Sequence, residues 1–196
     1  MARAYPERMH LVQIDDDIEG MKTVVSSTGP CQGTEASKGT LDKIIRLAAK
    51  LMSQEACCLW GLNPSDNEFY MPCSVSRKHG LVLGSCFGLL NRWEDTLLPS
   101  LSSSGQHEDV ERTIRHLERD GRVLRMSFAA VVSKYRTNLG GMQATFGKPA
   151  WREMEAQRVA KEMARRWPQF GYVKPTDSCQ FVWRHKGLMP LPIAKL

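Results

Sequence analysis

The chain has 196 residues, of which 42% are hydrophobic and 24% are charged, and its formal net charge is +6. This length suits one domain or two small ones, and so much apolar sequence excludes a globally disordered chain. The longest apolar run, residues 81–90, is far shorter than the ~20 residues that a membrane-spanning helix needs. The N-terminus also lacks the apolar segment of a secretory signal. We therefore expect an intracellular, cytoplasmic protein.

The six cysteines are irregularly spaced, and no two of them stand at the C-x-x-C spacing of a zinc site. Reduced cysteines in a core fit this pattern better than disulfides do. The five histidines are scattered, and the chain has no phosphate-binding, dinucleotide-binding or serine-nucleophile motif. The absence of these motifs favours a protein without a metal or cofactor, and a non-enzymatic function over an enzymatic one.

The N-terminal part predicts two short strands, at residues 9–14 and 22–25, on either side of an acidic turn. Residues 26–40 are rich in Ser, Gly and Thr, which is typical of a loop. Apolar residues then recur every three or four positions over residues 41–56. An amphipathic helix is expected there, with Thr40 as its N-cap.

Two patterns follow this helix. The segments CCLWGL, residues 57–62, and EFYMPCSV, residues 68–75, flank the turn sequence NPSDN and predict a β-hairpin. In the run 81–93, Gly84 and Gly88 stand four residues apart, a spacing that permits close helix packing and weakens a strand. We predict a helix for this run.

The most regular apolar pattern extends from residue 110 to residue 135, with alternating spacings of four and three. It predicts a heptad-type seam on one long helix, or on two helices broken at residues 120–121. The seam consists of Val110, Ile114, Leu117, Gly121, Leu124, Phe128, Val131 and Tyr135. We interpret it as a core helix or an intramolecular helical hairpin. The alternative is an interface with a second copy or a protein partner, through Val110, Ile114, Leu117 and Leu124.

A final helix is predicted between the prolines at 149 and 168, followed by short extended pieces. The predicted fold is α+β: a small antiparallel sheet packed with three to five helices, and a helical C-terminal half that ends in a short extended tail. We divide the chain into an N-terminal α+β region, residues 1–104, and a basic helical region, residues 105–196. A single domain overall is the alternative.

The positive charge is concentrated at the C-terminal end. From Lys148 onward there are ten Lys or Arg and four Asp or Glu, whereas 17 of each cancel over residues 1–147. An uneven distribution of this kind favours a polyanionic partner.

The last predicted helix is apolar on one side and carries Arg158, Lys161 and Arg165 on the other, where they can contact phosphates. Beyond it, basic residues alternate with aromatic ones, as in proteins on which single-stranded bases stack. The predicted nucleic-acid-binding residues are Arg158, Lys161, Arg165, Arg166 and Lys174 for phosphates, Trp183 for stacking, and Arg184. The alternative is a solvated helix, because Glu155 and Glu162 have basic neighbours three or four residues away.

The order of a charged helix, a Gly-containing turn and a basic helix over residues 108–167 resembles that of phage-type transcription regulators, including late-gene antiterminators, without a specific motif of theirs. The resemblance implies a non-enzymatic regulator that binds DNA or RNA, which is the leading hypothesis. The alternative class is a protein-interaction module, an adaptor or inhibitor that docks through the 110–135 seam.

Two further hypotheses concern the N-terminal region. Asp15 and Asp17, in the run DDDIEG, are candidate ligands of a magnesium-dependent nuclease. Ser26 stands where a calcium loop needs its bidentate Glu, so an acidic surface turn is the favoured interpretation of this run. Residues 41–75 resemble the start of a GAF-type small-molecule sensor domain, but they carry no ligand motif.

Overall fold

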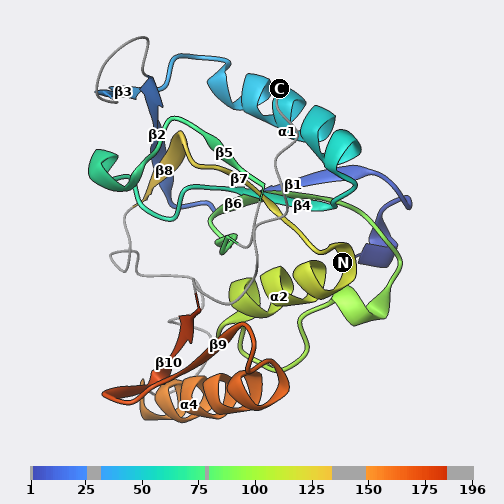
Figure 1. Ribbon diagram of the computed structural model, residues 1–196, viewed down its shortest axis with the longest axis vertical. Coiled ribbons are helices and arrows are strands. Elements are labelled where there is room, and N and C mark those ends of the chain that lie inside the picture. The colour runs from blue at the N-terminus through green and yellow to red at the C-terminus, as the bar shows by residue number, and fades with distance from the viewer. Residues whose placement is uncertain (1, 26–31, 78–79, 134–148, 185–196) are drawn as a thin grey trace.

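The computed structural model describes residues 2–25, 32–77, 80–133 and 149–184 (Figure 1). These residues form three α-helices, α1 (Thr40–Glu55), α2 (Glu108–Asp120) and α4 (Pro149–Arg166). Three short 3-10 helices are η1 (Ala2–Ala4), η2 (Glu68–Tyr70) and η3 (Asp95–Leu97). The ten strands are β1 (His10–Ile14), β2 (Ile18–Val25), β3 (Gln32–Glu35), β4 (Leu59–Leu62), β5 (Val75–Ser76), β6 (Cys86–Leu90), β7 (Leu124–Met126), β8 (Ala129–Ser133), β9 (Gly171–Lys174) and β10 (Asp177–Trp183). Among the described residues, we find no helix with the length and apolar content to cross a membrane.

The fold prediction was wrong in its proportions. The described chain is mixed α+β, but its strands form three sheets instead of one small antiparallel sheet. The C-terminal half is not helical, because strands β7, β8, β9 and β10 lie there beside α2 and α4. The division at residues 104 and 105 stays a prediction. One core cluster joins Leu59 and Phe87 to Ile114 and Met163, which lie on opposite sides of that boundary.

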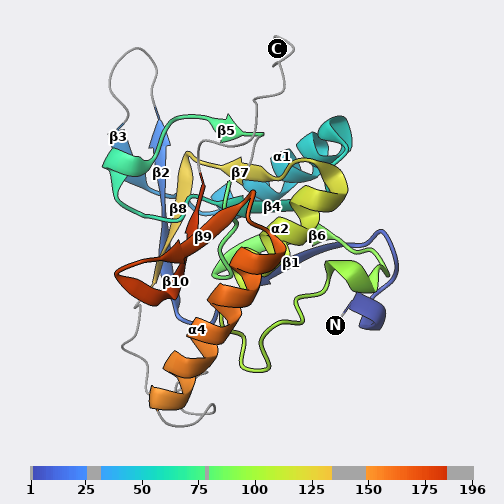
Figure 2. The same cartoon turned by 60° about the horizontal axis from the view of Figure 1, so that its bottom comes forward.

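Strands β1, β6, β4, β7 and β5 form the central sheet, in that order. Within it, β4 and β7 pair in parallel and the other described pairs are antiparallel. All four residues of β4 are buried, and they alternate between the two faces: Trp60 and Leu62 pack with α1, and Leu59 packs with α2 and α4. Figures 1 and 2 show the resulting layers, with α1 on one face of the sheet, α2 on the other, and α4 beyond α2.

The N-terminal strands were predicted correctly, but their surroundings were not. β1 pairs with β6 at the edge of the central sheet, whereas β2 lies between β3 and β8 in a separate three-stranded sheet. β3 falls in the segment predicted as a loop. The predicted helix at 41–56 is confirmed as α1, but Thr40 is its first residue, and the N-cap is Gly39, whose φ of 84° suits a residue without a side chain.

The two predictions for residues 57–93 were wrong. β4 and β5 do not form a hairpin, because β4 pairs with β6 and β7, and β5 pairs with β7. The run 81–93 contains strand β6 instead of a helix. Gly88 lies directly opposite Trp60 in the β4–β6 register, and a side chain there would overlap the buried indole ring. The glycine therefore makes room for an aromatic residue on a neighbouring strand, which its spacing from Gly84 did not reveal.

The apolar seam is helical only as far as residue 120. Gly121, at φ 73°, ends α2, and the later seam positions continue into β7 and β8. Val110, Ile114 and Leu117 are buried in the core on the α2 side of the sheet, and Leu124 is buried on the α1 side. The spacing of three and four therefore continued by coincidence across a turn. Tyr135, the last seam position, lies outside the described residues.

The contact between Gly88 and Trp60 generates a stability prediction. Gly88→Ala should lower the free energy of unfolding by about 1–3 kcal/mol, the usual cost of overpacking a core. The added methyl group must displace the Trp60 ring, whose Nε1 donates a hydrogen bond of 2.8 Å to Nε2 of His10. Urea denaturation measures the change.

Gly84→Ala is the matched control, because the nearest atom to its new methyl group is Nη2 of Arg112, at an ordinary contact distance of 3.7 Å. We expect its unfolding free energy to stay within about 0.5 kcal/mol of the native value. Equal destabilisation by the two substitutions would contradict the role assigned to Gly88.

Candidate nucleic-acid interface

Helix α4 has the two sides that its sequence predicted. Its apolar side faces the core formed with α2 and the central sheet, and its buried residues are Ala156, Val159, Ala160 and Met163, followed by Trp167. Arg158, Lys161 and Arg165 are exposed on the other side. The helix is therefore anchored by packing, and its cations are left at the surface.

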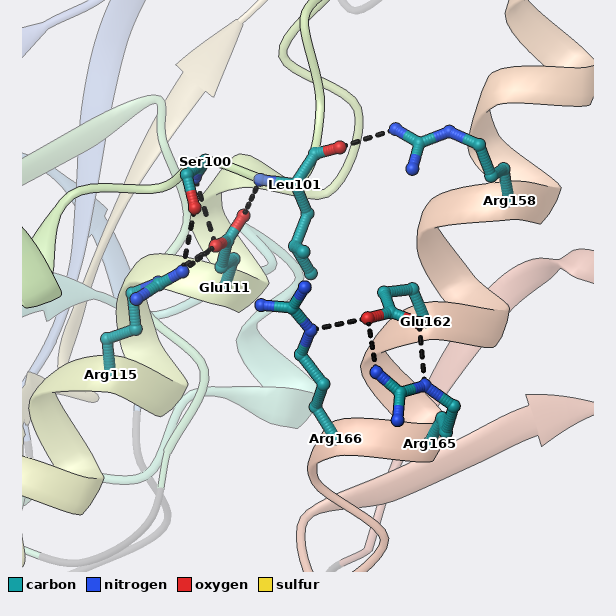
Figure 3. A network of polar contacts seen from close by, with 8 residues as sticks. All are labelled: Ser100, Leu101, Glu111, Arg115, Arg158, Glu162, Arg165 and Arg166. Atoms are coloured by element: carbon teal, nitrogen blue, oxygen red, sulfur yellow. Dashed lines mark hydrogen bonds and ion pairs between the residues drawn. The ribbon is translucent and has the colours of Figure 1, made fainter.

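Three arginines of α4 are paired with carboxylates of their own helix, and Figure 3 shows two of them, Arg165 and Arg166, with Glu162. Nε and Nη2 of Arg158 donate to Glu155, both at 2.8 Å, and Nη2 also donates to the carbonyl oxygen of Leu101. Nε and Nη2 of Arg165 donate to Glu162 at 2.8 and 2.7 Å, and Nε of Arg166 donates to the same carboxylate. These five side chains therefore carry a net charge of +1.

The paired carboxylates stay ionised at neutral pH. Hydrogen bonds from Arg165 and then Arg166 lower the pKa of Glu162 to about 2, and the hydrogen bond from Arg158 lowers the pKa of Glu155. Much of the charge that the sequence assigned to phosphate contacts is thus compensated within α4. Lys161 has no ion pair among the residues that the structure describes, so its charge is uncompensated there.

Strands β9 and β10 form a two-stranded antiparallel hairpin that packs beside α4. Its inner face contributes Phe181 and Trp183 to the core, and the rings of Trp183 and Phe170 lie 6.0 Å apart. His107, at the start of α2, hydrogen-bonds the carbonyl oxygen of Cys179 at 2.8 Å. The hairpin is therefore fixed to both helices.

The outer face of the hairpin, defined by Tyr172, Lys174, Gln180, Val182 and Arg184, points away from this core. Nζ of Lys174 donates to Oε1 of Gln180 at 3.4 Å, and the guanidinium carbon of Arg184 lies 5.3 Å from the centre of the Tyr172 ring. Asp177, the register partner of Lys174, adds one carboxylate beside this face, and its Oδ1 accepts a hydrogen bond from the backbone N–H of Cys179 at 3.0 Å. The outer face thus combines two cations with an aromatic ring that is 41% exposed.

The predicted interface residues are therefore placed on two surfaces. Arg158, Lys161, Arg165 and Arg166 lie on α4, and Lys174 and Arg184 lie on the outer face of the hairpin. Trp183, the predicted stacking residue, is half-buried on the inner face. The exposed aromatic residue of the hairpin is Tyr172, which the sequence prediction did not choose. Side chains alternate between the two faces along a strand. Tyr172 pairs with Val182, which is next to Trp183, so Tyr172 and Trp183 lie on opposite faces of the hairpin.

A buried carboxylate holds the loop that α4 contacts. Glu111, on α2, accepts hydrogen bonds of 3.0 Å from the backbone N–H groups of Ser100 and Leu101, and it forms an ion pair with Arg115 at 2.6 Å (Figure 3). Arg115 also donates to the carbonyl oxygen of Thr96 at 2.7 Å. The network fixes the backbone of residues 96–101 and so positions the Leu101 carbonyl that Arg158 contacts.

The other hypotheses find less support in the geometry. Among the described residues, no three His, Cys, Asp or Glu side chains are grouped closely enough to hold a metal ion. Burial raises the pKa of Asp15, and the neighbouring Asp17 and Asp16 raise it further. A cleft of about 240 Å³ between β2 and the start of α1 is lined mainly by apolar side chains. It is smaller than the ~300–1,000 Å³ of typical ligand pockets.

No protein-family model matches the chain, and the searches of curated proteins and of solved structures found no match either.

The buried position of Glu111 predicts a large cost for losing its charge. Glu111→Gln should destabilise the protein by about 3–5 kcal/mol. It leaves Arg115 without a carboxylate, and it places the NH₂ group of the glutamine opposite an N–H donor of the loop. Chemical denaturation measures the loss. Glu162→Gln removes the same charge at the surface of α4 and should leave the denaturation midpoint nearly unchanged. Equal effects of the two substitutions would contradict a structural role for the Glu111 network.

Proposed function

We propose that this chain is a non-enzymatic regulator that binds nucleic acid through a helix–hairpin surface, defined as the exposed side of α4 and the outer face of the hairpin. The observation that carries the proposal is the outer face itself, where an exposed tyrosine lies together with Lys174 and Arg184, neither of which forms an ion pair among the described residues. Residues 149–184 contain seven Lys or Arg and four Asp or Glu, a formal charge of +3. Phosphate groups are attracted to such a surface.

The cations differ in how readily they can take a phosphate. Lys161, Lys174 and Arg184 form no ion pair with a carboxylate among the described residues, so we assign them the main phosphate contacts. Arg165 and Arg166 are held by Glu162 in exposed ion pairs, which contribute little to stability. A phosphate can therefore replace the Glu162 carboxylate as their partner. Arg158 is tied both to Glu155 and to the Leu101 carbonyl, so we rank it last.

The proposal includes an intracellular site of action. Cys57, Cys58, Cys86 and Cys179 carry free thiols, as is usual where thiols are kept reduced. Burial raises the pKa of Cys57 to about 12 and that of Cys86 to about 11, so these two thiols are poor nucleophiles at neutral pH. This supports a structural role for them instead of a catalytic one.

The protein-interaction hypothesis has a weaker basis in the geometry. Val110, Ile114, Leu117 and Leu124 are all buried inside this chain. A partner that used them would have to open the core, so we do not propose that route.

Binding should depend on salt and on the hairpin cations. We expect the full chain to bind fluorescein-labelled DNA or RNA oligonucleotides in an anisotropy titration, with a log–log dependence on salt. Lys174→Gln combined with Arg184→Gln should lower the slope by about 1.4–1.8, at about 0.7–0.9 per phosphate contact.

The control for this pair is Lys43→Gln combined with Lys50→Gln, which removes the same charge from exposed positions of α1. Helix α1 lies on the other side of the central sheet, so this variant should retain the native slope. Equal losses in both variants would show that only the net charge matters. Salt-independent binding, or none at low salt, would overturn the proposal.

The ion pairs of Glu162 predict a gain of affinity. Glu162→Gln releases Arg165 and Arg166 from their carboxylate, so it should add about one phosphate contact. One contact steepens the salt slope by about 0.7–0.9 and raises the affinity roughly fivefold at about 0.1 M salt. Glu118→Gln, on the exposed side of α2, removes the same charge elsewhere and should change the affinity much less. The assignment fails if both variants bind the oligonucleotide equally well.

A further inference from the structure

We infer that the outer face of the hairpin binds single-stranded nucleic acid, with the Tyr172 ring as the surface on which an unpaired base stacks. The inference rests on the proposed function and names the class of nucleic acid that this surface selects. It starts from the position of the ring, which is 41% exposed and lies opposite Val182 in the β9–β10 register.

The hairpin holds this ring on a rigid support. On the inner face, Trp183 packs against Phe170, and Phe181 lies so close to Gly171 that a side chain there would overlap its ring. The chain next to Tyr172 is thus anchored in the core. An aromatic side chain on an ordered strand loses little conformational freedom when a base stacks on it.

The cations near the ring favour an extended single strand. Lys174 stands two residues from Tyr172 along β9, roughly 7 Å away at the rise of a strand, and Arg184 lies against the ring. A base that stacks on Tyr172 would therefore have a cation close to its phosphate on each side. The faces of bases are covered in a duplex and open in a single strand, so an aromatic ring can stack only on the latter.

Three other exposed aromatic residues stand beside carboxylates in the chain. Phe69 and Tyr70 are 86% and 63% exposed, but Asp66 and Glu68 stand beside them in the chain. Trp93 is 51% exposed and is followed by Glu94 and Asp95. Carboxylates at these positions repel a polyanion. Charge therefore distinguishes Tyr172 from these three rings.

The test compares single-stranded and duplex probes on the full chain. A fluorescein-labelled oligothymidylate, an oligouridylate and a DNA duplex of equal length are titrated with native protein, Tyr172→Phe and Tyr172→Val. Tyr172→Val keeps a residue that favours strands, so the hairpin should be preserved. We expect it to weaken binding to both single strands roughly 5- to 150-fold, the usual effect of losing one stacked base.

The remaining variants and probes separate the contribution of stacking from that of charge. Tyr172→Phe should retain single-strand affinity, and neither variant should change duplex affinity or the salt slope. Tyr70→Val removes an exposed tyrosine elsewhere and should have no effect. The inference is overturned, and the proposed function stands, if Tyr172→Val weakens single-strand and duplex binding equally or has no effect on either. If the native protein binds none of the three probes at low salt, the proposed function fails and the inference fails with it.

Discussion

The carboxylate of Glu111 is the constraint on which the C-terminal part of the structure depends. It is fully buried on α2, where it accepts hydrogen bonds from two backbone N–H groups of the preceding loop and forms an ion pair with Arg115. A buried charge is costly unless its hydrogen bonds are complete, so the loop has little freedom to leave this position. The loop in turn presents the Leu101 carbonyl to Arg158 of α4, and the Arg115 guanidinium lies 5.6 Å from the Trp167 ring at the end of that helix.

This arrangement explains why α4 and the hairpin expose the surfaces they do. α2 lies between the central sheet and α4, so both helices use their apolar sides within one core. The hairpin completes that core with Phe181 and Trp183, and its opposite side is left to solvent. Charge can collect there without cost to packing. The carboxylates of Glu155 and Glu162 partly neutralise α4, whereas Lys174 and Arg184 of the hairpin form no ion pair among the described residues.

Local patterns predicted several elements well. The amphipathic periods of α1 and α4 follow from contacts within one segment and its own buried side. The short strand predicted at residues 9–14 is likewise confirmed as β1. Contacts between distant segments were not predictable in this way. Gly88 leaves room for the ring of Trp60 on another strand, so its spacing from Gly84 misled the prediction for β6. The seam after Gly121 kept a helical spacing while its residues entered β7 and β8, which pair with β4, β5 and β2.

The same limit applies to the candidate site. The sequence identified the cations of α4 and the hairpin, because charge is a local property. It did not show which aromatic residue faces outward, since that depends on which side of the hairpin meets Phe170. It also did not reveal the role of Glu111, because its partners, the N–H groups of residues 100 and 101, became visible only in the folded chain.

The central claim is that nucleic acid contacts the outer face of the hairpin, and photo-crosslinking tests it most directly. The full chain would be irradiated with an oligonucleotide that carries 5-bromouracil, and the crosslinked peptide would be identified by mass spectrometry. The account predicts crosslinks within residues 171–184, centred on Tyr172. Crosslinks confined to Phe69, Tyr70 or Trp93, or binding without any crosslink in the hairpin, would contradict it.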